Sequence, residues 1–370
     1  MNFEIKIFNN FDSNIETIWD EFEKESNNYC FQNFYWLKNW HLNLNNKTNI
    51  KIFNVLVYQS KKIVMIVPLC VEKKNGLKIL KWQGGNRSDY MGCLLTPNFS
   101  IEKKNFIEIW KKIKKEIKLF DIIYFQRQPK KILDNINPFF YYLKNYEDYV
   151  TNSIALEEDF NIFLNKNIKN KFISDTKRRI NGLEKIGKLE FKIIDNTLDL
   201  KIRSTIEKIF TEKALRLKKY NLKNPFNEEA KKFYLNFKNQ FFKNGYSHLS
   251  KLVVGETIIS YHWGVVYKNV FYHLVPTITD SEYIKYAPGR IHLQNLIKWA
   301  TSQNILKFDF TIGDEQYKKD WANSSEHLYS HVELNSYLYI FHYFFLNLKV
   351  VIKKLSIIQK TLKNFIKVRN

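Results

Sequence analysis

The pattern of apolar residues gives the same order of elements twice along the chain: hairpin, strand, helix, strand. The first copy occupies residues 50–71, 91–95, 101–119 and 121–126. The second copy occupies residues 248–267, 270–275, 290–303 and 305–311. The halves share this order of periodicities but almost no sequence identity, as expected of an old internal repeat. We therefore expect an α+β fold built from two similar units, each with a mixed sheet flanked by helices.

The segment between the two copies has helical periodicity over residues 159–186 and 198–243, with a strand-like run at 189–194. No low-complexity linker separates the copies, and we place the boundary near residue 150. The chain is thus predicted to contain an N-terminal half (1–150), a C-terminal half (151–335) and a tail. The tail, residues 336–370, has seven Lys or Arg, no acid and an apolar helical stripe. It predicts a basic amphipathic helix that packs on the body of the protein or lies on an anionic membrane surface.

The overall charge favours anionic partners. Lys plus Arg number 59 against 37 Asp plus Glu, a net charge of +22, which suits CoA, nucleic acid or anionic lipid. The frequent use of Asn, Lys and Ile is also what an A/T-rich genome produces without selection for binding. The basic segment 166–188 has a single aromatic, Phe172, and this disfavours nucleic-acid binding.

The cysteines and the ends of the chain bear on its location. The three cysteines lie far apart and match no metal spacing, so no metal site and a reducing compartment are expected. The first sixteen residues lack the basic-then-apolar pattern of a secretion signal, and no apolar run reaches the length of a membrane span. We expect a cytoplasmic protein that is soluble or peripheral to the inner membrane face.

Strand alternation selects the first candidate residues. On the closing strand, Asp309 shares a face with Lys307 and Thr311, opposite the apolar face that packs on the core. His262 shares a face with Ser260 and Gly264, whose small side chains leave room for a ligand. The ordinary alternative for each is a hydrogen-bonded structural residue.

A second candidate lies where the last amphipathic helix begins. Pro288 and Gly289 directly precede it, with Lys285 and Arg290 beside them. The free N–H groups and the dipole of a helix start bind phosphate or diphosphate. An ordinary helix start has the same spacing.

Two adjacent stretches, YAPGRIHLQNLIKWA (286–300) and KFDFTIGDEQYKKDW (307–321), resemble the GNAT superfamily of acyl-CoA-dependent N-acyltransferases. More narrowly they resemble the tandem GNAT proteins of the CelD-like group, associated with cellulose and exopolysaccharide biosynthesis. WQGGNRSDYMG (82–92) and TKRRINGLEKIGKLEF (176–191) are similar to the same group. The likeness covers about residues 30–335. It departs at the phosphate loop, because KYAPGRI keeps a single glycine.

The resemblance implies a tandem GNAT fold in which strands 270–275 and 305–311 diverge and hold the pantetheine arm of an acyl-CoA between them. Backbone N–H groups at His273, Leu274 and Val275 would polarise the thioester carbonyl. Asp309 would orient or deprotonate the incoming amine. Tyr317 would protonate the departing thiolate, and Lys318 would hold a phosphate or carboxylate. With His262 these are the candidate catalytic residues; Lys285, Pro288, Gly289 and Arg290 would bind the CoA phosphates.

The function implied is transfer of an acyl group, most simply acetyl, from acyl-CoA to an amine of a sugar or of a polysaccharide or cell-envelope precursor. Two alternatives stay open. Fem-type transferases share the double fold and use aminoacyl-tRNA as donor, and a non-catalytic, membrane-associated scaffold of polysaccharide biosynthesis would keep the fold and the tail.

Overall fold

The computed structural model describes residues 3–44, 49–157, 159–194, 199–222, 224–237, 245–279 and 282–335. The predicted basic tail, 336–370, lies outside the described residues. The helices of the first half are α1 (Ser13–Glu25), α2 (Phe34–Leu42), α3 (Lys103–Ile117) and α4 (Pro138–Tyr142), with short 3-10 turns at Cys30–Gln32 and Gly85–Arg87. Its strands are β1 (Phe3–Phe8), β2 (Ile50–Gln59), β3 (Lys62–Lys74), β4 (Leu77–Trp82), β5 (Leu94–Leu95), β6 (Ile122–Pro129), β7 (Lys131–Ile132), β8 (Asn135–Ile136) and β9 (Asn145–Ala155).

The second half repeats the order of elements. Its helices are α5 (Phe160–Asn167), α6 (Asn170–Glu184), α7 (Asp199–Lys219), α8 (Glu228–Leu235), α9 (Pro288–Ser302) and α10 (Gln316–Lys319), with a 3-10 turn at Glu282–Tyr286. Its strands are β10 (Leu189–Ile193), β11 (Gly245–Val254), β12 (Thr257–Tyr267), β13 (Val270–Ile278), β14 (Lys307–Ile312) and β15 (Ser324–Leu334). Each predicted hairpin, long helix and closing strand of the repeat is therefore present.

The third strand of the first half differs from the prediction. It is β4, which pairs with β3 and runs parallel to β6, whereas residues 94–95 form a two-residue strand that pairs with β3 and bridges to Asn27. Leu77, Leu80 and Trp82 of β4 are buried, but their spacing is not a strict alternation. Two lysines lie between these residues, and a charged segment of this kind is typical of a loop.

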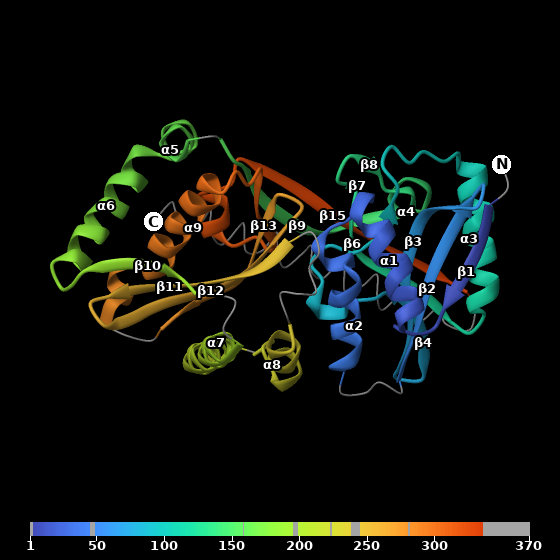
Figure 1. Cartoon of the computed structure of the whole chain (residues 1–370), viewed down its shortest axis with the longest axis horizontal. Helices are drawn as coiled ribbons and strands as arrows, with labels where there is room; N and C mark the ends of the chain where they lie inside the picture. Colours follow the sequence, from blue (N-terminus) through green and yellow to red (C-terminus); the bar gives the residue numbers. More distant parts are fainter. Residues whose placement is uncertain are drawn as a thin grey trace, which may run out of the picture.

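One continuous sheet joins the two halves, because each half gives its last strand to the other. The order is β1-β2-β3-β4-β6-β15-β9-β14-β13-β12-β11-β10, with β5 off the edge of β3. β9 ends the first half but pairs with β14, and β15 ends the second half but pairs with β6. Figure 1 shows these two strands crossing between the lobes. The boundary proposed near residue 150 falls inside β9.

Two helical layers cover the sheet of the second half. In Figure 1 α9 lies above β11 and β12, and α7 lies below them. The apolar face of β14, Phe308 and Phe310, is fully buried against α9 residues such as Leu293 and Leu296. Leu306 has the parity of Phe308 and Phe310 in the sequence, but it precedes the strand and is 67% exposed.

Buried hydrogen bonds tie the halves together beside this sheet. The Tyr267 hydroxyl donates to the Glu23 carboxylate at 2.5 Å and accepts from the Asn28 amide at 2.9 Å. The ammonium of Lys268 donates to the Glu23 carbonyl at 2.7 Å and to the Asn28 side chain at 2.7 Å. The turn between β12 and β13 is thus fixed to α1, which sets the position of β13.

A glycine on β12 makes one close approach possible. A Cβ added at Gly264 would lie 2.6 Å from the Tyr272 carbonyl oxygen and 2.6 Å from the His262 ring. We expect Gly264→Ala to destabilise the fold by about 1–3 kcal/mol, because the adjoining strand must shift to make room. Urea denaturation measures the loss. Gly92→Ala is the matched control, since its new Cβ would meet Ile132 at an ordinary 3.5 Å; equal stabilities of the two variants would contradict the prediction.

Candidate active site

Strands β13 and β14 separate after a short parallel contact. They pair at three positions, Val270 with Lys307, Phe271 with Phe308 and Tyr272 with Asp309, although β13 continues to Ile278. Beyond these pairs β14 bends at Thr311, whose φ of 58° is left-handed and unfavourable for a β-branched residue. The Thr311 N–H donates to Asp309 Oδ1 at 2.7 Å. The carboxylate of Asp309 therefore holds the bend that opens the gap between the strands.

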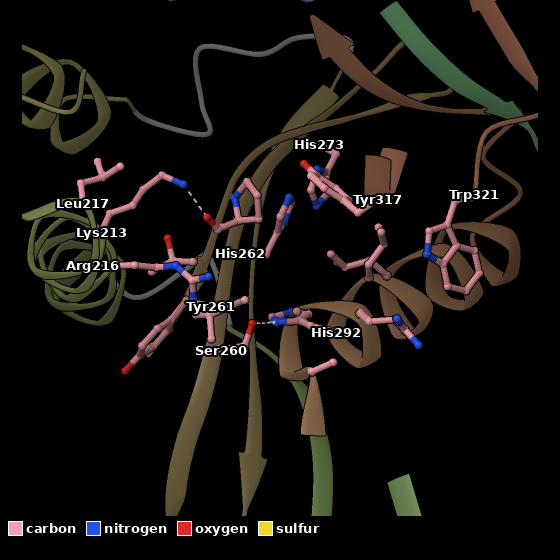
Figure 2. Close-up of a pocket in the computed structure, with 18 of the residues that line it drawn as sticks. Lys213, Arg216, Leu217, Ser260, Tyr261, His262, His273, His292, Tyr317 and Trp321 are labelled. Carbon is pink, nitrogen blue, oxygen red and sulfur yellow. Dashed lines mark hydrogen bonds between the residues drawn. The ribbon is translucent and has the colours of Figure 1, made fainter. Parts of the chain in front are cut away.

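A cavity of about 500 Å³ lies along the open edge of β13. Its walls are mainly apolar, and these side chains include Phe172, Leu217, Phe226, Ile278, Leu293, Leu296 and Trp321. Figure 2 shows α7 and α9 on opposite sides of the strands, both with side chains turned toward the cavity. The cavity thus reaches both faces of the sheet.

Two buried histidines line this cavity with ring nitrogens that lack hydrogen-bond partners. Within the described residues neither ring nitrogen of His262 has a partner, nor does Nδ1 of His273. The two rings stack with centroids 4.5 Å apart, and their side chains are 1% and 4% exposed. Burial, with repulsion between the two rings as the next cause for His262, holds its pKa well below the usual range. Burial, with Lys318 next, does the same for the pKa of His273. These shifts favour the neutral form of both imidazoles, and their nitrogens that lack partners can accept a hydrogen bond.

A third histidine differs because its nitrogens are engaged. His292 on α9 lies 2.9 Å from Ser250 Oγ and 2.7 Å from Ser260 Oγ. Burial lowers its pKa to about 3. The ring therefore acts as a neutral bridge between α9 and the hairpin, and it fixes the strand that carries His262.

Tyr317 of α10 also turns its ring toward the cavity (Figure 2). Its ring centroid lies 6.4 Å from that of His273, and the side chain is 39% exposed. Burial raises the pKa of the phenol above its usual value. The hydroxyl therefore keeps its proton at neutral pH and can donate it.

Lys213 of α7 closes the cavity on the opposite face. Its ammonium donates to the Pro276 carbonyl at 2.5 Å, on the part of β13 that β14 has left (Figure 2). Burial, followed by repulsion from Arg216, lowers the pKa of Lys213 to about 8. The protonated form of Lys213 is therefore destabilised here, and an anion bound beside the ammonium would stabilise it.

The start of α9 presents arginines more than free amides. Pro288 has no N–H, and the amides of Arg290 and Ile291 both donate to the Ala287 carbonyl, at 3.0 and 3.3 Å. The Arg290 guanidinium donates to Asp175 at 2.7 Å and lies 4.2 Å over the Phe172 ring. Asp175 also accepts from two arginines of α6, Arg178 and Arg179. Three cations around one carboxylate leave a net positive surface, so these residues fit the phosphates of an acyl carrier through their guanidinium groups.

The structure brings together only part of the predicted site. His262, His273, Tyr317, Gly289 and Arg290 line the cavity, whereas Leu274, Val275, Lys285, Pro288, Asp309 and Lys318 do not. Gly289 packs closely, since a Cβ there would lie 2.8 Å from Ile278. Leu274 and Val275 follow the last paired residue of β13, so their backbone lies along the gap.

Asp309 and Lys318 occupy structural positions. The side chain of Asp309 is fully buried on the face away from α9, where both oxygens accept from the Tyr90 hydroxyl at 2.9 and 3.0 Å. Lys318 is 4% exposed, and its ammonium donates to the Ile312 carbonyl at 2.6 Å and pairs with Glu315 at 3.1 Å. The sequence correctly predicts polar surroundings for Asp309, but those surroundings are protein and not the cavity.

Sequence reasoning missed the residues that the opposite face contributes. Lys213 and Arg216 come from α7, which lies far along the chain from α9. Their spacing of three residues on one helix was a usable signal. Their position beside β13 was not visible in the pattern.

The described residues contain no group of three or more His, Cys, Asp or Glu arranged to hold a metal ion. None of the described helices combines the length and apolarity needed to cross a bilayer.

Comparison with known proteins supports the fold. The crystal structure of FemX superposes with a TM-score of 0.59 at 11% identity, covering 88% of this chain and 97% of that one. The structure of L-PGS from Bacillus licheniformis superposes with a TM-score of 0.54 at 12% identity, covering 90% of this chain and 95% of that one. A conserved protein of unknown function from Bacteroides thetaiotaomicron superposes with a TM-score of 0.53 at 12% identity, covering 88% of this chain and 99% of that one. No curated protein matches the chain by sequence.

A match to a protein family falls on the half that carries the cavity. Residues 170–319 match the family described as acetyltransferase (GNAT) domain. This range begins at α6 and ends at α10, so it includes the arginine cluster, both walls of the cavity and the diverging strands. Residues 170–319 are therefore similar to a GNAT acetyltransferase domain, and they lie within one large mixed sheet flanked by helices.

Proposed function

We propose that the protein is an acyl-CoA-dependent N-acyltransferase that transfers an acyl group, most simply acetyl, to an amine. The observation that carries the proposal is the gap between β13 and β14, which pair at only three positions and border a cavity open to both faces of the sheet. An extended thioester arm fits such a gap, because the unpaired edge of β13 offers backbone hydrogen bonds. The donor phosphates would lie against Arg178, Arg179 and Arg290.

The reaction needs one proton acceptor and one proton donor. The amine nitrogen attacks the thioester carbonyl, a C–N bond forms, the C–S bond breaks, and the thiolate leaves. Because they line the cavity, His262 and His273 would take the proton released by the amine in this scheme, and Tyr317 would give one to the thiolate. The β13 backbone at His273 to Val275 would stabilise the oxyanion. Asp309 acts at a distance in this scheme, because it holds the bend in β14.

The acceptor we propose is an amino sugar or an amine of a polysaccharide or cell-envelope precursor. Support comes from the resemblance of residues 82–92, 176–191, 286–300 and 307–321 to the CelD-like group. This acceptor places the protein in the cytoplasm, free or at the inner membrane face.

An aminoacyl-tRNA-dependent transfer of the Fem type is the second candidate. Two observations favour it: the fold shared with FemX at a TM-score of 0.59, and a helix start that offers guanidinium groups in place of a row of amides. A non-catalytic role in polysaccharide biosynthesis would leave the unpartnered histidines unexplained.

Direct binding separates the two donors. We expect calorimetry to show acetyl-CoA binding that Arg290→Met weakens by about 10- to 100-fold, since a hydrogen bond to a charged group contributes about 1.5–3 kcal/mol. Lys298→Met on the exposed end of the same helix is the matched control and should change little. Salt-sensitive binding of tRNA with no binding of acetyl-CoA would contradict an acyl-CoA donor and favour an aminoacyl-tRNA donor.

Turnover of a panel of acyl-CoAs with amino-sugar nucleotides, followed by mass spectrometry, then identifies the product. Binding of acetyl-CoA without transfer to any amine of the panel would point to a different acceptor class. Binding of neither donor would contradict the proposal.

A further inference from the structure

The α7 side of the cavity carries two cations without an anionic partner. Lys213 and Arg216 are three residues apart on α7 and so share a face of the helix. Within the described residues neither forms an ion pair with Asp or Glu. Lys213 contacts the Pro276 carbonyl at 2.5 Å, and the Arg216 guanidinium lies 5.9 Å from the Tyr220 ring.

The surroundings of this pair make an anion favourable. The neighbouring lining is apolar and includes Leu217, Phe226 and Ile278. A cation beside such walls loses hydration, and two cations side by side repel each other. The pKa of Lys213, lowered to about 8 by burial first and by Arg216 next, is the result of these two effects. An anion bound between the two side chains would offset both.

The acids nearby are already engaged. Asp320 lines the cavity and accepts from the Gln316 side chain at 2.9 Å. Glu315 pairs with Lys318 at 3.1 Å. Glu315 attracts Lys213 from a distance and partly offsets the fall in its pKa. Within the described residues neither acid forms an ion pair with Lys213 or Arg216, so both cations can take a bound anion.

The position of the pair indicates which substrate it serves. The arginine cluster at the start of α9 lies on the other face of the sheet, and it supplies cations for the phosphates of a donor. Lys213 and Arg216 lie on the α7 face, at the opposite end of the same cavity (Figure 2).

We propose that Lys213 and Arg216 bind an anionic oxygen group, carboxylate or phosphate, of the acyl acceptor, which enters the gap from the α7 side. The role of this ligand as acyl acceptor rests on the proposed function. The presence of an anion site does not depend on that function. It narrows the acceptor to an amine that also carries a negative charge.

Binding of three related amino sugars tests the proposal without turnover. Glucosamine has no anionic group, glucosamine 6-phosphate adds a phosphate, and muramic acid adds a carboxylate. By calorimetry we expect at least one anionic sugar to bind more tightly than glucosamine. Lys213→Met and Arg216→Met should each weaken that ligand by about 10- to 100-fold, as for other charge-assisted hydrogen bonds. Glucosamine binding should be unchanged.

Lys218→Met is the matched control, because Lys218 is exposed on the same helix and does not line the cavity. If the two variants weaken glucosamine 6-phosphate, the site binds phosphate. If they weaken muramic acid, the site binds carboxylate. The proposal is overturned if all three sugars bind alike, or if Lys218→Met has the same effect as Arg216→Met. It is equally overturned if the two variants weaken acetyl-CoA and spare the sugars.

The same measurements distinguish this inference from the proposed function. Charge-dependent sugar binding without any acyl transfer would keep the anion site and remove the reaction. Transfer to neutral amines, unaffected in both variants, would keep the reaction and remove the anion site.

Discussion

His262→Leu is expected to be more stable than the natural chain and almost inactive. Both ring nitrogens of His262 are buried without partners, and a buried polar group left unsatisfied costs about 1–3 kcal/mol. Leucine is of similar size and removes that cost. If the ring accepts the amine proton, its loss should lower kcat by about 100- to 10,000-fold. Urea denaturation and thiol release from acetyl-CoA measure the two effects.

His292→Leu is the control for stability, because His292 is hydrogen bonded to Ser250 and Ser260. Its replacement leaves two buried hydroxyls without partners and should destabilise the fold. The two histidines thus predict opposite signs for the same substitution. A His262→Leu protein that keeps activity within about tenfold, well short of the loss expected for a general base, would remove His262 from the reaction.

The same variant should change the response to acid. Burial holds the pKa of His262 well below its usual range, so the folded chain keeps the ring neutral while the unfolded chain protonates it below about pH 6.5. Since the unfolded state then binds more protons, stability falls as pH falls through this range. Replacing the ring should make the slope shallower by about 1.4 kcal/mol per pH unit. Unfolding midpoints between pH 7 and 5 provide the measurement.

Asp309→Ala is expected to cost more stability than any other single change proposed for this chain. The substitution leaves the Tyr90 hydroxyl and the Thr311 N–H without their acceptor in a fully buried position. Each orphaned donor costs about 1–3 kcal/mol. The bend at Thr311 also loses its support, so the gap between β13 and β14 should close or become disordered. Denaturant unfolding gives the loss, and hydrogen exchange of β14 locates it.

Two variants separate structure from catalysis at this position. Tyr90→Phe alone should cost less, and the double variant should cost less than the sum of the two, because they share a hydrogen bond. Asp309→Asn keeps the shape and an acceptor for the Thr311 N–H. If Asp309→Asn folds normally but loses about 100-fold or more in kcat, the carboxylate acts as a base, as the sequence resemblance implies.

The sequence predicted the repeated units because periodicity reports burial. The pairs of hairpins, the helices at 101–119 and 290–303 and both closing strands follow from apolar spacing. The strand at 77–82 was missed because Lys78 and Lys81 interrupt its apolar residues without a regular alternation. The exchange of β9 and β15 was also missed, since spacing within a strand does not say which strand lies beside it.

The sequence likewise predicted only part of the candidate site. By itself the sequence determined that His262 shares a face with Ser260 and that Asp309 lies opposite Phe308 and Phe310, because successive side chains of a strand point to opposite faces. The tertiary structure alone decided that His262 and His273 stack on one face, because a register shift interrupts the pairing of β12 with β13 between them. Only the tertiary structure decided that Asp309 faces Tyr90 of the other half, and that Lys213 lies opposite α9 at the open edge of β13. These contacts join residues more than sixty positions apart, and no local pattern fixes the packing of segments so distant in the chain.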